Sequence, residues 1–327
     1  MVACPSCGAR PFIPADLEMF QTTPCPKCGH PLMVPFRLRQ FELRAPIASG
    51  GNGTVYRAFD TVLEREVALK MIRPELANAP DSLENFYREA RACASLNHTN
   101  IIHIYTFDEH EGMRYLVMEL ADRGSLAGMI EKQQCVPELD VLDIGIKIIS
   151  ALEMALKHNL LHSDIKPENI LFNADGEPKL VDFGLARKAD DDSAHEGATY
   201  GTVFYVAPEK LTHQPETFLS DMYSLGATLY HAMTGHVPFM ATTQNDIVLA
   251  HIQTPVTPPN QVVPEITQPA SEALVRAMAK APGDRFQSYA EFRLALEAAR
   301  SQLLVARYNQ AYEGGDTDRG QRTWWRR

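Results

Sequence analysis

The chain has 327 residues, a formal net charge of −10 and a hydrophobic fraction of 45%, values that are ordinary for a soluble globular protein of about two domains. The acidic charge argues against a general nucleic-acid-binding surface, because phosphate backbones are held mainly by Lys and Arg. The sequence contains no apolar run of the length, about 18 residues, that a membrane-spanning helix needs. The N-terminus lacks the basic start and apolar run of a secretory signal, so we expect a cytoplasmic protein.

Four of the six cysteines form two Cys-x-x-Cys pairs near the N-terminus, Cys4 with Cys7 and Cys25 with Cys28. Each pair lies in a Cys-Pro-x-Cys-Gly frame, where proline fixes φ and glycine permits a positive φ, so both thiols of a pair should point to one spot. In a reducing compartment this spacing indicates metal binding before disulfides. Four soft ligands suit tetrahedral zinc, and residues 1–36 therefore resemble a zinc ribbon.

Four protein ligands leave no open position on a zinc ion, so we expect a structural site that supplies the folding energy of a short segment. Redox use of the cysteine pairs is the weaker alternative, because no βαβ pattern surrounds them. His30 is a further candidate ligand. Such a ribbon can also bind a partner, and we expect that partner to be a protein. The small positive net charge of residues 1–40 is only a weak argument for nucleic acid.

The next stretch is typical of a strand-rich unit that begins at Phe41. Residues 47–55 read Ile-Ala-Ser-Gly-Gly-Asn-Gly-Thr-Val, and one hairpin later the chain reads Val-Ala-Leu-Lys, ending at Lys70. Glycines let backbone amides approach phosphate groups closely, because no Cβ is in the way. Taken alone, this glycine-rich turn is also consistent with a plain hairpin.

Residues 81–96 carry apolar side chains at the three-four spacing that predicts a helix with one buried face. Glu89 lies beside that apolar stripe, and Glu84 lies more than a turn earlier. Two further strands should follow around a turn at 108–112.

The most informative stretch is 162–169, which reads His-Ser-Asp-Ile-Lys-Pro-Glu-Asn. Apolar residues on both sides predict a rigid polar loop. Within it, Asp164 can accept a proton, Lys166 can neutralise a moving phosphoryl group, and Asn169 can ligate a hard cation through its amide oxygen. Asp182 follows in an Asp-Phe-Gly triplet.

These two segments resemble the catalytic loop and the metal-binding triplet of the eukaryotic-type serine/threonine protein kinases, in the form found in bacteria. The resemblance covers residues 41–304. It implies an α+β, bilobal protein kinase fold, with a β-rich small lobe and an α-rich large lobe, preceded by the zinc ribbon at 1–36. Residues 305–327 are then expected to form a flexible tail after a last helix that ends near 303–306.

The resemblance also implies ATP and Mg²⁺ as cofactors and roles for individual residues. Asp182 and Asn169 would ligate Mg²⁺, while Asp164 would align the substrate hydroxyl and accept its proton. Lys166 would contact the γ-phosphate, and Thr202 would steady Asp164 and Lys166. Lys70 would orient the α- and β-phosphates, with Glu89 as its expected partner and Glu84 as the second candidate. The positions that the resemblance places around the nucleotide are Ile47, Ala48, Gly50, Gly51, Asn52, Gly53, Val55, Ala68, Lys70, Glu89, Met118, Glu119 and Leu171.

Three further positions match structural residues of the family. Asp221 resembles the buried helix acid that ties down the backbone of the catalytic loop. Arg285 matches the arginine that pairs with the glutamate of an Ala-Pro-Glu motif, here Glu209. A helix over about 138–158 should lead into the catalytic loop, and a shorter one should start near 124–126.

Two positions depart from the family pattern. Ala48 replaces the first glycine of the glycine-rich turn, and Ser163 stands where the common sequence has an arginine that pairs with a phosphate on the activation segment. Because serine cannot form that pair, we predict a basal activity that does not depend on activation-segment phosphorylation. The hydroxyls available for phosphorylation there are Thr199, Ser193 and Thr202.

The sequence therefore predicts an ATP-dependent serine/threonine protein kinase that acts on protein substrates. A nucleotide-binding pseudokinase scaffold is one alternative, favoured only by Ala48 and Ser163. An adaptor that works through the zinc ribbon is the other. Near the C-terminus, Trp324 and Trp325 with their flanking arginines are consistent with a docking or membrane-surface anchor or with a mobile chain end.

Overall fold

The structure is a computed structural model of the whole chain. It forms two compact units, a strand-rich unit that begins at the N-terminus and a helical unit that contains the C-terminus. The strand-rich unit comprises Met1–Arg123, Asn173–Glu177 and Phe183–Leu185, and the helical unit comprises Gly124–Phe172, Pro178–Asp182 and Ala186–Arg327. The structure describes all residues except 3, 5, 15, 16, 18, 19, 51, 52, 73–93, 184–186, 189–201 and 317–327.

The N-terminal segment contributes three short strands to the strand-rich unit. β1 (Thr23–Pro24) pairs antiparallel with β2 (Pro31–Leu32), and β3 (Phe36–Leu38) joins the large sheet beside β4. Gly8 and Gly29 have φ values of +70° and +74°, the left-handed conformation predicted for the glycine that closes each Cys-Pro-x-Cys-Gly frame.

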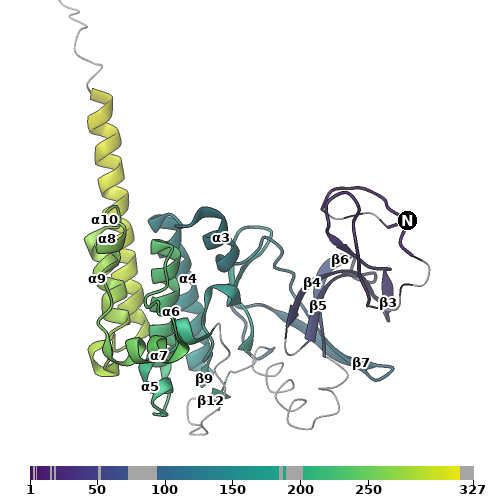
Figure 1. Ribbon diagram of the computed structural model, residues 1–327, viewed down its shortest axis with the longest axis horizontal. Coiled ribbons are helices and arrows are strands. Elements are labelled where there is room, and N and C mark those ends of the chain that lie inside the picture. The colour runs from purple at the N-terminus through teal and green to yellow at the C-terminus, as the bar shows by residue number, and fades with distance from the viewer. Residues whose placement is uncertain are drawn as a thin grey trace, which may run out of the picture. The chain divides into compact units, whose positions relative to one another are not determined.

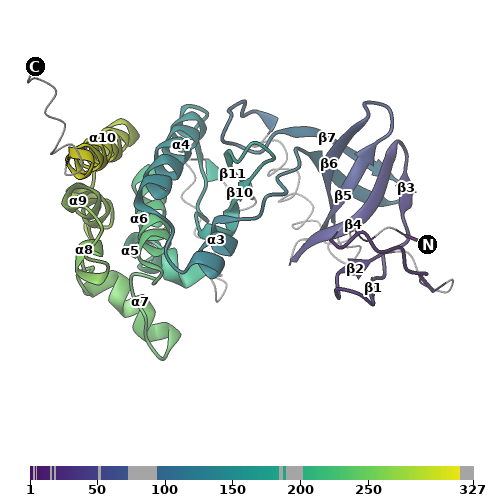
Figure 2. The ribbon, with the colours of Figure 1, turned by 90° about the horizontal axis from the view of Figure 1, so that it is seen from above.

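The large sheet has six strands in the order β3-β4-β5-β6-β8-β7, and every neighbouring pair is antiparallel (Figure 2). The turn that joins β7 to β8 lies at Glu111 and Gly112, inside the predicted range 108–112. The strands not yet given bounds are β4 (Phe41–Gly50), β5 (Gly53–Asp60), β6 (Arg65–Ile72), β7 (Ile104–His110) and β8 (Met113–Met118).

The two faces of this sheet bury different side chains. Tyr56 opposes Leu69 across β5 and β6, and both belong to a buried cluster that also contains Met33 from the N-terminal segment, whose side chain is 0% exposed. The neighbouring pair, Val55 and Lys70, points to the other face because side chains alternate along a strand. The N-terminal segment therefore covers the face of the sheet opposite to Val55 and Lys70.

The helical unit is built around α4, which packs against α6 and α10, while α9 packs against α6 and α10 (Figures 1 and 2). Both helices predicted before the catalytic loop are confirmed. The helices are α3 (Leu126–Gln133), α4 (Glu138–Lys157), α5 (Pro208–Leu211), α6 (Phe218–Thr234), α7 (Gln244–Gln253), α8 (Pro259–Val262), α9 (Gln268–Ala277) and α10 (Tyr289–Asp316). The short strands are β9 (Leu160–Leu161), β10 (Ile170–Phe172), β11 (Pro178–Leu180) and β12 (Arg187–Lys188).

The last helix is longer than the sequence analysis predicted. An end near 303–306 is wrong, because α10 continues to Asp316, and residues 305–316 of the predicted flexible tail are helical (Figure 1). Residues 304–313 contain good helix formers and no proline, so the helix propagates at little cost once its first turns have packed. Trp324 and Trp325 lie outside the described residues.

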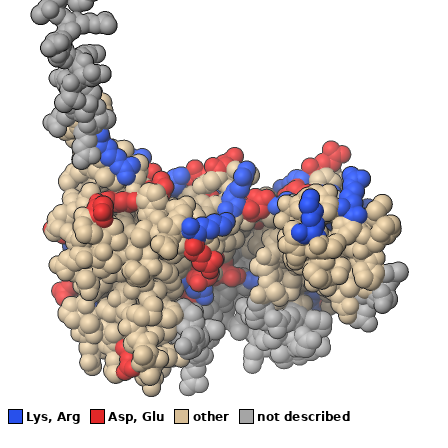
Figure 3. Space-filling view, turned by 45° about the horizontal axis from the view of Figure 1, so that its top comes forward, with Lys and Arg blue, Asp and Glu red and all other residues tan. Residues whose placement is uncertain are grey.

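Figure 3 shows the charged side chains on one face of the molecule. On the face shown in Figure 3, acidic and basic groups of the described residues are interspersed, and they form no single basic patch there. Within the described part of the chain, none of the helices combines the length and the hydropathy needed to cross a bilayer.

Candidate functional site

Three predicted catalytic residues meet around one carboxylate on the loop between β9 and β10. The Nζ atom of Lys166 donates a hydrogen bond to Asp164 Oδ2 at 2.7 Å. The Nδ2 atom of Asn169 donates to the same oxygen at 3.1 Å and to the backbone carbonyl oxygen of Asp164 at 2.8 Å. The local cause is a 3₁₀ turn over Pro167–Asn169, in which proline presets φ and the turn brings Asn169 back to Asp164.

The backbone of this loop is held by Asp221 in α6. Its two carboxylate oxygens accept hydrogen bonds from the backbone N–H groups of His162 and Ser163, each at 2.8 Å. Burial raises the pKa of Asp221, and the electrostatic interaction with His162 and these backbone hydrogen bonds oppose that shift. The predicted role of Asp221 in tying down the loop is confirmed.

His162 connects the catalytic loop to the segment that carries Asp182, a role that the sequence analysis missed. Its Nδ1 atom accepts from the backbone N–H of Asp164 at 3.3 Å, so Nε2 carries the proton and donates to the carbonyl oxygen of Val181 at 2.9 Å. The backbone N–H of Val181 in turn donates to the carbonyl oxygen of Asn169 at 3.0 Å. The available signal was the position of His162 at the head of the polar loop.

Asp182 follows β11 with an exposed side chain and a φ of +61°, which is uncommon for a residue other than glycine. Leu171 lies in β10, opposite Lys179 of β11. Thr202 begins a 3₁₀ turn that runs to Tyr205, and its side chain is not described, so its contact with Asp164 stays a prediction.

A buried ion pair holds the segment that follows this turn. Arg285 Nη1 and Nη2 donate to the two carboxylate oxygens of Glu209 at 2.7 and 2.8 Å, and the side chains of Arg285 and Glu209 are 0% and 4% exposed. Burial raises the pKa of Glu209, but the hydrogen bonds and charge of Arg285, with the Ser220 hydroxyl, outweigh it and lower that pKa. The predicted pairing of these two residues is confirmed.

Several predicted nucleotide contacts share one face of the large sheet. Val55 opposes Lys70 on β6 and Ala48 on β4, while Ala68 opposes Met118 on β8. Ala68 and Lys70 are two residues apart on one strand, so the alternation of side chains puts the whole group on the same face. Lys70 is 7% exposed there.

The glycine-rich turn closes where Gly50 pairs with Gly53. Gly53 has a φ of +150°, and a Cβ at that position would lie 1.9 Å from the carbonyl oxygen of Met71, so a side chain does not fit. Ile47 is 45% exposed on β4, and the backbone N–H of Glu119 donates to the carbonyl oxygen of His103 at 2.8 Å. The predicted residues that lie outside the described ones are Gly51, Asn52, Glu84, Glu89, Ser193 and Thr199.

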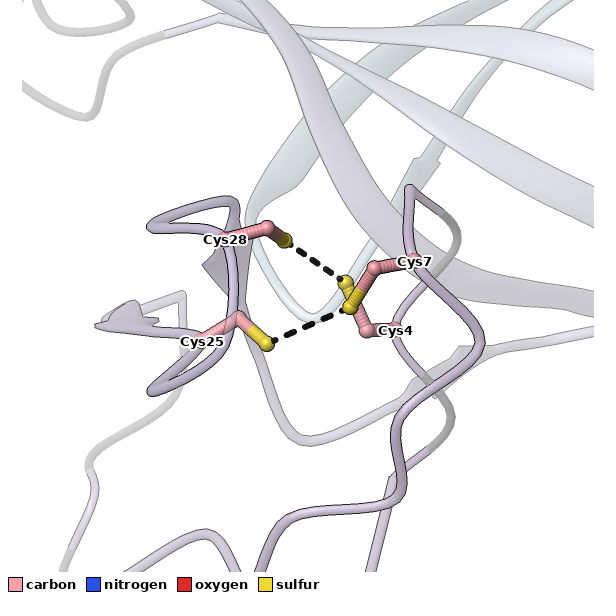
Figure 4. Close-up of side chains that lie close together, drawn as sticks. All are labelled: Cys4, Cys7, Cys25 and Cys28. Atoms are coloured by element: carbon pink, nitrogen blue, oxygen red, sulfur yellow. Dashed lines mark hydrogen bonds between the residues drawn. The ribbon is translucent and has the colours of Figure 1, made fainter.

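The four cysteines of the N-terminal segment converge on one point (Figure 4). Their sulfur atoms all lie within 4.8 Å of one another, with 3.6 Å between Cys4 and Cys28 and 3.8 Å between Cys7 and Cys25. A tetrahedral ion with metal–sulfur bonds of about 2.3 Å requires sulfur separations of about 3.8 Å. The cluster therefore has the dimensions of a tetrahedral metal site, and His30 is not part of it.

Two thiols of the cluster differ in acidity. A backbone hydrogen bond from His30 lowers the pKa of Cys28 to about 7. At Cys7 a backbone hydrogen bond from Ala9 lowers the pKa, but desolvation and the neighbouring thiols outweigh it and raise the pKa to about 12. Of these two thiols, Cys28 is therefore the more acidic.

Comparison with known proteins identifies the family. The protein kinase domain family matches residues 41–293, which include Lys70, Asp164 and Asp182. The chain belongs to the protein kinase family. In this kinase the strand-rich unit contains the small lobe and the helical unit forms the large lobe, so the predicted bilobal α+β fold is confirmed. The cysteine cluster precedes the matched residues.

The relatives of this kinase include bacterial proteins named as serine/threonine-protein kinases. PknE of Mycobacterium bovis is 36% identical over 260 residues, covering 79% of this chain and 46% of PknE. PrkC of Bacillus subtilis is 33% identical over 250 residues, covering 76% of this chain and 39% of PrkC. The probable serine/threonine-protein kinase CPE1738 of Clostridium perfringens is 31% identical over 278 residues, covering 85% of this chain and 41% of CPE1738. The chain thus spans less than half the length of these relatives.

Proposed function

We propose that this protein kinase transfers the γ-phosphoryl group of ATP to serine and threonine hydroxyls of protein substrates. The observation that carries the proposal is the Asp164 carboxylate, held by Lys166 and Asn169 on a loop whose backbone is tied to the buried Asp221. Phosphoryl transfer depends on positioning and charge neutralisation more than on covalent chemistry, and a braced acid beside a lysine provides both.

Each residue of the loop has a separate task in this proposal. Asp164 orients the substrate hydroxyl and accepts its proton. Lys166 keeps the Asp164 carboxylate in place and puts a positive charge beside the point of transfer. Asn169 turns its amide nitrogen toward Asp164, which leaves the amide oxygen on the other side of the group.

The residues present fit the cofactors of the family. ATP supplies the phosphoryl group and Mg²⁺ neutralises its charge when they are bound. The amide oxygen of Asn169 and the carboxylate of Asp182 are the hard oxygen ligands that Mg²⁺ prefers. Lys70, with Glu89 as its proposed partner, provides the cation for the phosphates. Ala48, Val55, Ala68 and Met118 provide a small-residue and apolar surface for the adenine ring on the same sheet face as Lys70.

A phosphorylation assay with radiolabelled ATP and a general protein substrate tests this function. We expect Asp164→Asn to reduce incorporation to background, because the amide cannot accept the proton. Asp175→Asn is the matched control, since Asp175 is exposed in the turn between β10 and β11. Equal incorporation by the unmodified protein and Asp164→Asn would refute the enzyme and favour the pseudokinase scaffold.

We further propose that basal activity does not require phosphorylation of the activation segment. Ser163 supports this, because its side chain cannot pair with a phosphate as the arginine found in other family members does. The hydroxyls that would be tested, Ser193 and Thr199, lie outside the described residues.

We also propose that Cys4, Cys7, Cys25 and Cys28 hold a structural zinc ion, in a ribbon of residues 1–36 that precedes a kinase domain of residues 41–304. Side chains of the ribbon pack against the sheet, which supports a structural role over a free adaptor. The ring of Phe20 lies 5.4 Å from that of Phe36 and 5.7 Å from that of Tyr56, beside the buried Met33. Metal analysis of Cys4→Ser and Cys25→Ser tests the site, and zinc content equal to that of the unmodified protein would exclude it.

A further inference from the structure

Lys210 makes a contact with the catalytic loop that the sequence did not suggest. It lies in α5, and its Nζ atom donates a hydrogen bond to the backbone carbonyl oxygen of Ser163 at 2.8 Å. The backbone N–H of Ser163 donates to Asp221 Oδ1 at 2.8 Å. The peptide groups on both sides of Ser163 are therefore held, one by a carboxylate and the other by an ammonium group, immediately before Asp164.

The backbone of Ser163 needs such support. Its φ is +65°, a left-handed conformation that costs energy for a residue other than glycine and persists only where the surroundings enforce it. The Oγ atom of Ser163 is buried and has no hydrogen-bond partner among the described residues. The side chain of Ser163 thus does not hold this conformation, and the backbone contacts of Asp221 and Lys210 do.

The surroundings of Lys210 are acidic and partly shielded from water. A cavity of about 10 Å³ beside the loop is lined by the carboxylates of Asp164, Glu216 and Asp221, and its volume suffices for about one water molecule. Of the described residues lining this cavity, Lys210 alone is basic. Its Nζ atom lies 3.5 Å from Glu216 Oε2, and the side chains of Lys210 and Glu216 are 23% and 8% exposed. Solvent therefore screens the positive charge of Lys210 only in part.

Lys210 reaches the loop from a fixed base. It follows Glu209 in the one-turn helix α5, and Glu209 is clamped by the fully buried Arg285. The backbone N–H of Lys210 also donates to the carbonyl oxygen of Ala207 at 3.1 Å. The ion pair of Glu209 and Arg285 thereby sets the place from which Lys210 extends to Ser163.

We propose that Lys210 is a positioning residue for phosphoryl transfer. Through the Ser163 carbonyl it holds the peptide that leads into Asp164, and it does so constitutively, so that no phosphate on the activation segment is needed to order the catalytic loop. The inference rests on the proposed kinase function and specifies how that function is regulated. The charge partner of Lys210, Glu216, lies in the same lobe as Lys210.

The test compares Lys210→Met, Lys210→Arg and the control Lys157→Met in protein treated with phosphatase. Lys157 is an exposed lysine in the last turn of α4. Steady-state kinetics give kcat and the KM for ATP, and hydrogen exchange gives the protection of residues 160–169. We expect Lys210→Met to lower kcat roughly tenfold, to keep the KM within about twofold and to speed exchange about tenfold, as loss of a charged hydrogen bond predicts. Lys210→Arg keeps the charge and should recover most of kcat.

Two results would overturn the positioning role: a kcat for Lys210→Met equal to that of Lys157→Met, or an equal loss in Lys210→Met and Lys210→Arg. If Lys210→Met does not fold, Glu216→Gln decides, because it removes only the partner of Lys210. The Glu216→Gln variant should then lower kcat and speed hydrogen exchange at an unchanged melting temperature. A kcat and an exchange rate equal to those of the unmodified protein would reject the role. A wild-type rate no higher than that of Asp164→Asn would reject the kinase function instead, while hydrogen exchange still reports on Lys210.

Discussion

Replacing Arg285 by methionine leaves the Glu209 carboxylate buried without its cation. The side chains of Arg285 and Glu209 are 0% and 4% exposed, so water cannot take the place of the guanidinium group. Breaking a buried pair in this way costs about 3–5 kcal/mol of folding free energy. Arg285 also donates to the backbone carbonyl oxygens of Leu219, Ala279 and Lys280, and these lose their donor as well.

This cost is large enough to measure by thermal unfolding. At roughly 2–4 °C per kcal/mol for a unit of this size, the melting temperature of the large lobe should fall by about 10 °C. The control is Arg293→Met, which removes a surface pair with Glu297 at 3.1 Å on α10 and should change stability by less than about 1 kcal/mol. Circular dichroism and calorimetry give the melting temperatures of both variants.

A second substitution separates lost charge pairing from lost packing. Arg285→Met combined with Glu209→Leu removes both charges, so the double variant should be more stable than Arg285→Met alone. The reasoning is refuted if Arg285→Met stays within about 1 kcal/mol of the unmodified protein, or if the double variant recovers nothing.

The same pair predicts a pH dependence with a defined sign. Arg285 holds the folded-state pKa of Glu209 below its unfolded value, so the ionised pair contributes stability that is fully present above the unfolded pKa of 4.5. That contribution is lost as the pH falls through the lower, folded-state value. Denaturant unfolding between pH 7 and pH 3 should show this loss of stability in the unmodified protein and not in Arg285→Met. An identical change of unfolding free energy with pH in the two proteins would contradict the prediction.

Three further predictions concern the small lobe and the regulation. Gly53→Ala should lower both stability and affinity for a fluorescent ATP analogue, because the new Cβ would meet the carbonyl oxygen of Met71; unchanged binding would contradict this. Cys25→Ser or a chelator should destabilise the small lobe by about 2–5 kcal/mol through the lost burial of the ribbon, and an unaltered melting curve would contradict a structural zinc. Ser193→Ala with Thr199→Ala should keep the basal kinase rate, whereas a collapse in activity would exclude phosphorylation-independent activity.

Residues close together in the chain explain most of what could be predicted. The catalytic loop is one such case, because its three functional residues lie within six positions of one another, at Asp164, Lys166 and Asn169. Their side chains are therefore brought into contact by local geometry. Each cysteine pair is likewise a local knuckle, closed by a glycine at positive φ. The longer-range pairing of Glu209 with Arg285 was predicted by resemblance to the kinase family, not by any pattern within the chain.

Tertiary structure decided the contacts between segments that are distant in sequence. Lys210 reaches the Ser163 carbonyl from 47 positions away, and Met33 joins a core made mainly by later strands. These contacts depend on where packed elements bring backbone groups, and an isolated lysine or methionine carries no local signal of that placement. The continuation of α10 to Asp316 also escaped prediction, because the residues beyond its last packed turn keep helical propensity without an apolar period. The amino-acid sequence alone determined the chemistry of the catalytic loop and the cysteine ligands, and the fold determined what holds them in place.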